Sequence, residues 1–151
     1  MINIALLGCG TVGSGVVKLL TANSEAIARK TGTQIRIVKV LEKEPEKCYA
    51  LGLQAEQVTS DFAEIVQDKT IDIVVELMGG MEPAFSFITD AMKQGKHIVS
   101  ANKDLIAEKG KELFAFLLQS HNRNITKGGL LDNLWTEVDH GRAIKHLYNG
   151  I

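Results

Sequence analysis

The chain has 151 residues, the usual size of one domain, and its 17 basic and 18 acidic residues leave a net charge of −1. This balance argues against a nucleic-acid-binding protein, because such proteins usually carry a basic stripe. No apolar run approaches the roughly 20 residues that span a bilayer, and the N-terminus lacks the pattern of a signal peptide. We therefore expect a cytoplasmic protein that contacts neither nucleic acid nor membrane.

Strand-like and helix-like segments alternate from Met1 to about Ser120. Short apolar runs predict five strands, at Ile2–Leu7, Gln34–Leu41, Val58–Thr59, Ile71–Leu77 and His97–Ser100. Apolar residues at helical spacing predict a helix from Val12 to about Lys30 that ends near Gly32, one capped by Asp61, one with Pro83 in its first turn that ends at Gly95, and one over Leu105–Leu118 with a break near Gly110. This alternation predicts a single α/β domain over residues 1–120. We expect a doubly wound parallel sheet of the Rossmann type, with strand order 3-2-1-4-5.

The end of the chain, residues 121–151, has a different character. It opens with a polar run and a glycine-containing loop, Lys127-Gly128-Gly129. Apolar residues between Leu130 and Tyr148 then predict one more helix. We interpret this segment as a helical tail outside the dinucleotide fold.

Neither the cysteines nor the histidines predict a metal site. Cys9 and Cys48 form no metal-ligand spacing and no disulfide framework, as expected of a reducing compartment. His97 lies in a predicted strand, and the other three histidines are scattered through the tail without helical pairing. We therefore expect no metal, and we interpret Cys9 as a small residue in a tight turn.

A glycine loop follows the first predicted strand. Gly8-Cys9-Gly10-Thr11-Val12-Gly13 fits the pattern G-x-G-x-x-G and opens a helical segment, which is the context that a dinucleotide site requires. Gly8 permits the tight turn, Gly10 lets a pyrophosphate approach the backbone, and Gly13 lets the helix pack close to the strand. The free N–H groups at the start of the helix would then face the diphosphate.

The end of the second strand normally decides between NAD and NADP. An acidic residue there binds the adenosine ribose, whereas a basic residue accommodates a 2′-phosphate. This chain has both kinds, in Glu42-Lys43-Glu44. Glu42 or Glu44 would favour NAD and Lys43 would favour NADP, so the choice of cofactor stays open.

Two further loops follow the fourth and fifth strands, where ligands of this fold bind. Gly79 and Gly80 would let a nicotinamide ribose come close to the backbone. In the second loop, Ser100-Ala101-Asn102-Lys103, the lysine is placed to stabilise a developing alkoxide or to transfer a proton.

Three blocks of the sequence resemble the homoserine dehydrogenase family. They are residues 6–17 around the glycine loop, residues 72–80 with Glu76-Leu77-Met78-Gly79-Gly80, and residues 95–103, Gly-Lys-His-Ile-Val-Ser-Ala-Asn-Lys. Together they place the resemblance from Met1 to about Leu117. That family reduces aspartate 4-semialdehyde to homoserine with NADH or NADPH, on the route to threonine and methionine.

The resemblance implies a role for each candidate site residue. The pyrophosphate would be held by Gly8, Gly10, Thr11, Val12 and Gly13. Lys43 matches a basic position near the adenosine ribose, and Gly79 and Ser100 would line the nicotinamide side. Lys103 matches a lysine between cofactor and substrate that is implicated in proton transfer or in binding.

The resemblance ends before the chain does. Family members continue into a sixth strand, a glycine-rich stretch and a substrate and dimerisation domain, and Gly128-Gly129 is a poor match to that stretch. The resemblance therefore implies an NAD(P)-binding domain that takes an amino-acid substrate only together with a further domain. Whether the chain forms a homo-oligomer stays open. The alternatives are a free-standing NAD(P)-binding module without activity and another Rossmann dehydrogenase, against which the Asn102-Lys103 loop argues.

Overall fold

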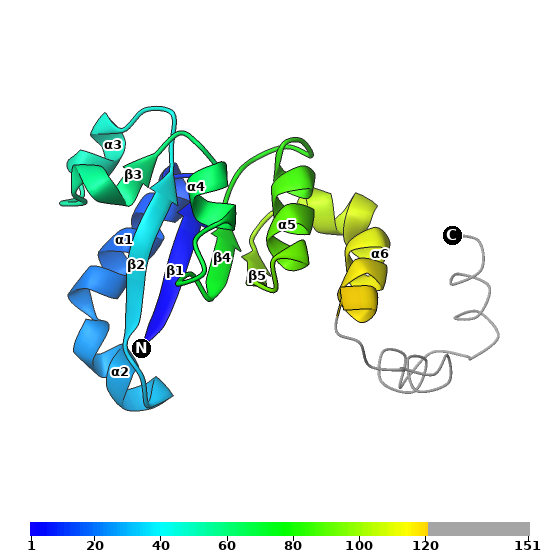
Figure 1. Cartoon of the computed structure of the whole chain (residues 1–151). Helices are drawn as coiled ribbons and strands as arrows, with labels where there is room; N and C mark the ends of the chain where they lie inside the picture. The colour runs from blue at the N-terminus through cyan, green and yellow to red at the C-terminus, as the bar shows by residue number, and fades with distance from the viewer. Residues whose placement is uncertain (121–151) are drawn as a thin grey trace. The chain divides into compact units, whose positions relative to one another are not determined.

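A five-stranded parallel sheet forms the centre of the fold (Figure 1). The computed structural model describes the backbone of residues 1–120 and the side chains of residues 1–117. The strands are β1 (Ile2–Leu7), β2 (Ile35–Leu41), β3 (Val58–Thr59), β4 (Ile73–Glu76) and β5 (His97–Ser100). Their order is β3-β2-β1-β4-β5 with all neighbours parallel, which confirms the predicted fold class and strand order.

The helices connect successive strands. They are α1 (Thr11–Ala22), α2 (Ser24–Thr31), α3 (Glu46–Tyr49), the 3-10 turn η1 (Ala55–Gln57), α4 (Ala63–Val66), α5 (Ala84–Lys93) and α6 (Lys103–Ser120). The chain divides after Gly110 into two units, and all five strands lie in the first. The helix expected between Leu130 and Tyr148 lies outside the described residues.

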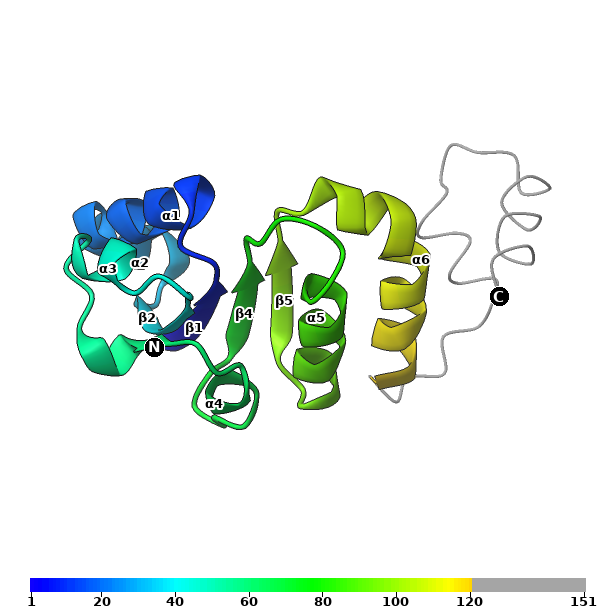
Figure 2. The same ribbon diagram turned by 90° about the horizontal axis from the view of Figure 1, so that it is seen from above.

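The two faces of the sheet are buried by different helices, because side chains alternate along each strand. Ile4 and Leu6 of β1 belong to a core cluster with Val17 of α1, whereas Ala5 and Leu7 belong to a second cluster with Ile65 of α4. Seen from above, α1 and α2 lie on one side of the strands, and α4 and α5 lie on the other (Figure 2). This arrangement makes the sheet doubly wound.

Two expectations about the extent of helices were wrong. The helix from Val12 to Lys30 is two helices, because Asn23 leaves the helical conformation (φ −119°, ψ 17°); its N–H and its side-chain Nδ2 both donate to the Leu19 carbonyl, each at 3.0 Å. α6, in contrast, has no break near Gly110 and starts earlier than expected, at Lys103. Asn102 caps it by accepting the Leu105 N–H at 3.1 Å.

Pro83 lies just before α5 rather than in its first turn, and its bond to Glu82 is cis. The short elements α3 and η1 carry too few residues for a hydrophobic period, so the sequence did not predict them. The glycine ends of two helices were predicted correctly: Gly32 (φ 72°) caps α2, and Gly95 (φ 76°) follows α5.

Candidate functional site

The carboxyl ends of four strands form one row at the same edge of the sheet. Leu7 of β1 pairs with Leu41 of β2 and with Glu76 of β4, and Glu76 pairs with Ser100 of β5. The glycine loop, the Glu42-Lys43-Glu44 turn and the loops after β4 and β5 all leave from this row. The register therefore brings every candidate site residue to one edge, as the sequence predicted.

The glycine loop packs against β4 on one side and is open on the other. Gly8 has φ +102°, a conformation that favours glycine, and a Cβ there would lie 3.4 Å from the Leu77 carbonyl oxygen. A Cβ on Gly13 would lie 2.2 Å from the Gly8 carbonyl oxygen, which shows how closely α1 approaches the loop. A Cβ on Gly10 would meet nothing within 4 Å among the described atoms. Glycine is thus favoured at position 8 by its backbone conformation and required at position 13 by packing, whereas the space above Gly10 is open.

The first turn of α1 leaves its N–H groups available. No side chain caps the helix, and its first turn holds no acidic residue. Thr11 and Val12 are both exposed there, Val12 by 56% despite being apolar. The unpaired N–H groups and the helix dipole together favour an anion at this position.

Glu42 ties the turn after β2 to the glycine loop. One carboxylate oxygen accepts the Cys9 N–H at 2.8 Å, and the other accepts the N–H groups of Lys43 at 2.9 Å and Glu44 at 3.2 Å. Partial burial acts to raise the pKa of Glu42, but the three backbone donors outweigh it and hold the pKa below its ordinary value. The carboxylate is therefore ionised at neutral pH and holds the loop in place, a role that the sequence analysis missed.

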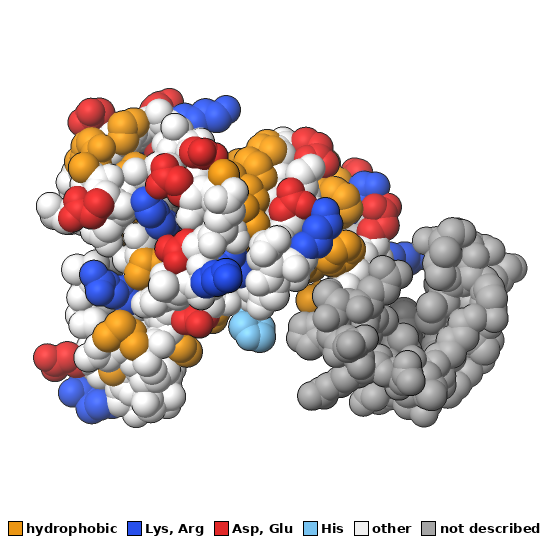
Figure 3. All heavy atoms as spheres, in the orientation of Figure 1, with side chains coloured by type: hydrophobic (Ala, Val, Ile, Leu, Met, Phe, Trp, Pro, Cys, Tyr) orange, Lys and Arg blue, Asp and Glu red, His pale blue; other side chains and the backbone are white. Residues whose placement is uncertain are grey.

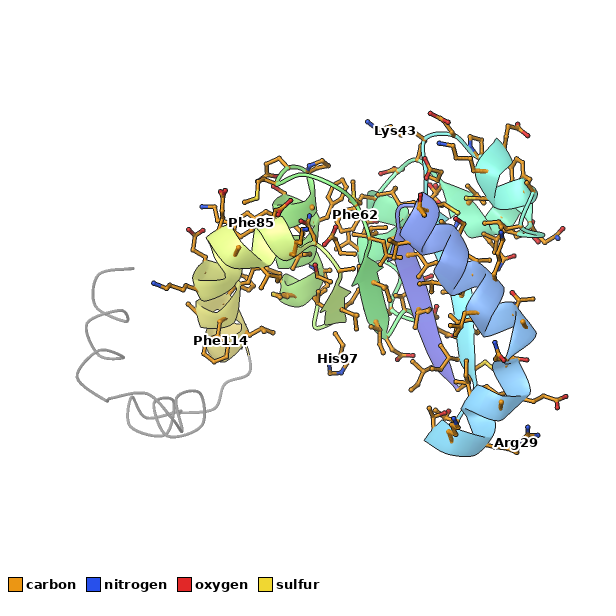
Figure 4. The ribbon with its side chains drawn as sticks, turned by 180° about the vertical axis from the view of Figure 1, so that it is seen from behind. Arg29, Lys43, Phe62, Phe85, His97 and Phe114 are labelled. Atoms are coloured by element: carbon orange, nitrogen blue, oxygen red, sulfur yellow. The ribbon has the colours of Figure 1, made fainter. Side chains whose placement is uncertain are left out.

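Lys43 and Glu44 differ in their partners. Glu44 forms an ion pair with Lys47 at 2.8 Å. Lys43 is exposed, and its ammonium has no ion-pair partner among residues 1–117. Figure 4 shows Lys43 at the carboxyl end of the strands and His97 at the opposite end. Of the three charged residues in this turn, Lys43 is the one whose charge is free to meet a ligand.

Glu76 lies fully buried at the end of β4 and links the two loops on the other side of β1. Its carboxylate accepts the Met78 N–H at 2.8 Å and the Ser100 hydroxyl at 2.6 Å. The sequence analysis quoted Glu76 but gave it no role. A charged residue inside the apolar run Ile71–Leu77 was the available signal, since a buried charge needs compensating partners.

The last predicted residues lie on these two loops. Gly79 is exposed, and a Cβ there would meet nothing within 4 Å. Ser100 is half-buried, with its hydroxyl engaged by Glu76. Lys103 is exposed in the first turn of α6, and its ammonium makes no hydrogen bond or ion pair within the described part of the chain. Lys103 is therefore placed to meet a ligand at this edge.

Both cysteines are buried thiols in the same core cluster. Burial raises the pKa of Cys48 to about 12, and the neighbouring Cys9 thiol adds to the effect. The Cys48 thiol is therefore protonated at neutral pH and is a poor nucleophile.

Within residues 1–120, no group of three His, Cys, Asp or Glu side chains is placed to hold a metal ion. Acidic and basic side chains are interspersed on the face shown in Figure 3. None of the helices in the described region is long and apolar enough to cross a bilayer.

Comparison with known proteins decides the family. A model of the NAD-binding domain of homoserine dehydrogenase matches residues 8–126. The chain belongs to this family. The predicted resemblance is thereby confirmed, and the match identifies a domain that binds a nicotinamide dinucleotide.

Homoserine dehydrogenases are among the relatives that match this chain. The enzyme of Lactococcus lactis is 46% identical over 123 residues, which are 80% of this chain and 28% of that protein. The crystal structure of the homoserine dehydrogenase of Thiobacillus denitrificans is 42% identical with a TM-score of 0.74, over 80% of this chain and 28% of that one. The chain spans about a quarter of the length of the curated relatives that it matches.

A more distant structure has the same fold. A hyperthermophilic archaeal homoserine dehydrogenase in complex with NADPH is 20% identical with a TM-score of 0.63, over 80% of this chain and 41% of that one. The Rossmann-type arrangement of β1 to β5 is therefore shared even where few residues are.

Proposed function

We propose that this chain is the cofactor-binding part of a homoserine dehydrogenase and that it prefers NADPH. The observation that carries the proposal is the row of strand ends, where an open glycine loop, an unpaired Lys43 and an exposed Lys103 meet at one edge. Nothing in the described residues fills the space above Gly10, and the neighbouring charges suit a phosphorylated ligand.

The glycine loop is proposed to bind the pyrophosphate. Gly8 and Gly13 set the backbone path, and the open space at Gly10 admits the phosphates. Thr11 and Val12 are at the start of α1, where their N–H groups face a ligand and α1 supplies the positive end of its dipole.

Lys43 is proposed to select NADPH. The Glu42 carboxylate accepts three backbone N–H groups, and Glu44 is paired with Lys47. Neither acid is therefore as free as Lys43 to meet the adenosine ribose. A lysine there attracts the 2′-phosphate that distinguishes NADPH from NADH. An NADPH complex of an archaeal relative is consistent with this preference.

Replacing Lys43 with alanine should weaken NADPH binding roughly ten- to hundredfold, because a charge-assisted contact of about 1.5–3 kcal/mol is lost. NADH binding should change little, since NADH lacks the 2′-phosphate. Isothermal titration calorimetry with both cofactors measures the difference. Lys47→Ala is the matched control, because it removes a lysine from the same turn that is already paired with Glu44. Equal losses for NADH and NADPH would contradict the proposed selectivity.

The nicotinamide half is proposed to lie over the loops after β4 and β5. The nicotinamide ring supplies or accepts the hydride when the cofactor is bound. Gly79 admits the ring and its ribose, and Ser100 shapes the wall beside them. Lys103, exposed at the start of α6, is placed to give a proton to the oxygen of an aldehyde as it becomes an alcohol, or to hold that oxygen. The substrates proposed are aspartate 4-semialdehyde and homoserine.

A polypeptide of these 151 residues should bind cofactor but oxidise homoserine negligibly. Positioning a substrate against its cofactor supplies roughly 7–11 kcal/mol of barrier lowering, and the chain matches about a quarter of its relatives' length. The assay follows absorbance of reduced cofactor with homoserine and NAD or NADP, with calorimetric cofactor binding as the control. Robust turnover would show a substrate site within these residues. A second prediction concerns Lys103. If adding the region of a relative that lies beyond the match to this chain restores turnover, Lys103→Ala should lower that turnover without loss of cofactor affinity.

We also propose that the cofactor-binding domain extends to about residue 120. The family match supports an extent near this point, since it covers residues 8–126.

A further inference from the structure

Glu76 is a carboxylate with no exposed surface, buried behind the two loops that are proposed to hold the nicotinamide. Burying such a group is costly, and an apolar side chain of similar volume would often cost less. The sheet holds Glu76 at the end of β4, opposite Leu7 and Ser100. Its side chain must therefore contribute something that an apolar residue could not.

The hydrogen bonds around Glu76 join two loops that are distant in sequence. Its Oε1 accepts the Met78 N–H at 2.8 Å, and its Oε2 accepts the Ser100 hydroxyl at 2.6 Å. The Ser100 oxygen in turn accepts the Asn102 N–H at 3.1 Å, and Asn102 Nδ2 donates to the Gly80 carbonyl at 2.7 Å. The side chains of Glu76 and Asn102 thus bond the loop after β4 to the loop after β5, beside a backbone bond of 3.0 Å from the Ala101 N–H to the Glu76 carbonyl.

A carboxylate is the side chain that fits between these donors. Both Met78 and Ser100 point a hydrogen at Glu76, so the group between them must accept twice. A carboxylate offers an acceptor oxygen to each donor, whereas a glutamine would turn an NH2 group toward one of the two donors. The geometry therefore depends on the carboxylate itself and not only on the volume of the side chain.

We propose that Glu76 is a positioning residue that sets the spacing of the two loops and thereby holds the nicotinamide half of the cofactor. The inference rests on the proposed function, because it assigns the loops after β4 and β5 to the nicotinamide. Glu76 is buried behind these loops and acts through Met78 and Ser100, without touching the ligand. Its loss should impair the nicotinamide half of the site and spare the adenosine half, which the glycine loop and Lys43 hold.

The test compares the whole cofactor with the fragment that lacks nicotinamide. NADPH and 2′-phospho-ADP-ribose, or NADH and ADP-ribose if the wild-type chain prefers NADH, are titrated by calorimetry into the wild-type chain and Glu76→Gln. We expect roughly tenfold weaker binding of the cofactor and a change within about twofold for the fragment, since one buried hydrogen bond is lost only on the nicotinamide side. The fluorescence of bound reduced nicotinamide gives a second readout, and its shift on binding should be lost in the variant.

A second variant keeps the test decisive if Glu76→Gln does not fold. Ser100→Ala removes one donor to Glu76 and should weaken cofactor binding in the same selective way, while Ser100→Thr keeps the hydroxyl and should restore it. Ser86→Ala is the matched control, because it removes a hydroxyl–carboxylate bond of 2.8 Å to Glu82 on the exposed side of α5.

Each other outcome overturns a distinct claim. Equal losses for cofactor and fragment would show a general structural role for Glu76, and unchanged cofactor binding in a folded variant would show no role. A wild-type chain that binds cofactor and fragment equally well would show that these loops hold no nicotinamide. A wild-type chain that binds neither would overturn the proposed function itself.

Discussion

Replacing Gly13 with alanine is expected to destabilise the fold by about 3 kcal/mol or more, at the upper end of what an added methyl group costs in a packed core. The new Cβ would lie 2.2 Å from the carbonyl oxygen of Gly8, a backbone atom that cannot rotate away. Either α1 or the glycine loop must move, and the loop is also held by Leu41 and Glu42. Urea unfolding followed by circular dichroism measures the loss.

Gly15→Ala is the matched control for this prediction. Gly15 lies in the same helix, is exposed, and would place its Cβ in open space. Alanine there should stabilise the fold by about 0.5–1 kcal/mol, because it restricts the unfolded chain and favours the helix. Glycine to alanine should therefore lower the free energy of unfolding at position 13 and raise it at position 15. A small effect at Gly13 would contradict the close packing of α1 on Gly8.

Gly10→Val is expected to abolish dinucleotide binding while the chain stays folded. The backbone at Gly10 (φ −72°) suits any residue, and the space that a Cβ would enter is open. Valine is a poorer helix N-cap than glycine, so we expect a loss of stability of at most about 1 kcal/mol. Its side chain would occupy the place proposed for the pyrophosphate.

Calorimetric titration of NADPH and NADH into Gly10→Val tests this expectation, with a thermal melt to show that the variant is folded. Gly10→Ala should give an intermediate affinity, because its single methyl group fills less of the same space. If Gly10→Val bound the cofactor as tightly as the wild-type chain, this result would contradict the assignment of the glycine loop to the binding site.

Much of the fold could be predicted because its signals are local. The apolar runs of β1 and β4 and the spacing of Gly8, Gly10 and Gly13 each depend on a few neighbouring residues. The break between α1 and α2 depends on the backbone conformation of one residue, Asn23, which no hydrophobic period reveals. The start of α6 likewise depends on the cap supplied by Asn102.

In the site, too, features with local sequence signals could be predicted and features that depend on distant contacts could not. Glycine and lysine positions at strand ends could be assigned from the order of segments along the chain. The roles of Glu42 and Glu76 could not, because their partners Cys9 and Ser100 lie 33 and 24 residues away in sequence. Such bonds depend on strand register, which places Leu41 beside Leu7 and Glu76 beside Ser100.

The bond between Glu42 and Cys9 constrains any attempt to re-engineer cofactor choice. Redesigns of Rossmann enzymes naturally target the residues after the second strand, and here three charged residues stand together. Glu42 is the wrong target, because its removal would release the glycine loop and should weaken the binding of NADH and NADPH alike. Lys43 and Glu44 are the separable pair: a library restricted to these two positions should alter the discrimination between NADH and NADPH without disturbing the glycine loop.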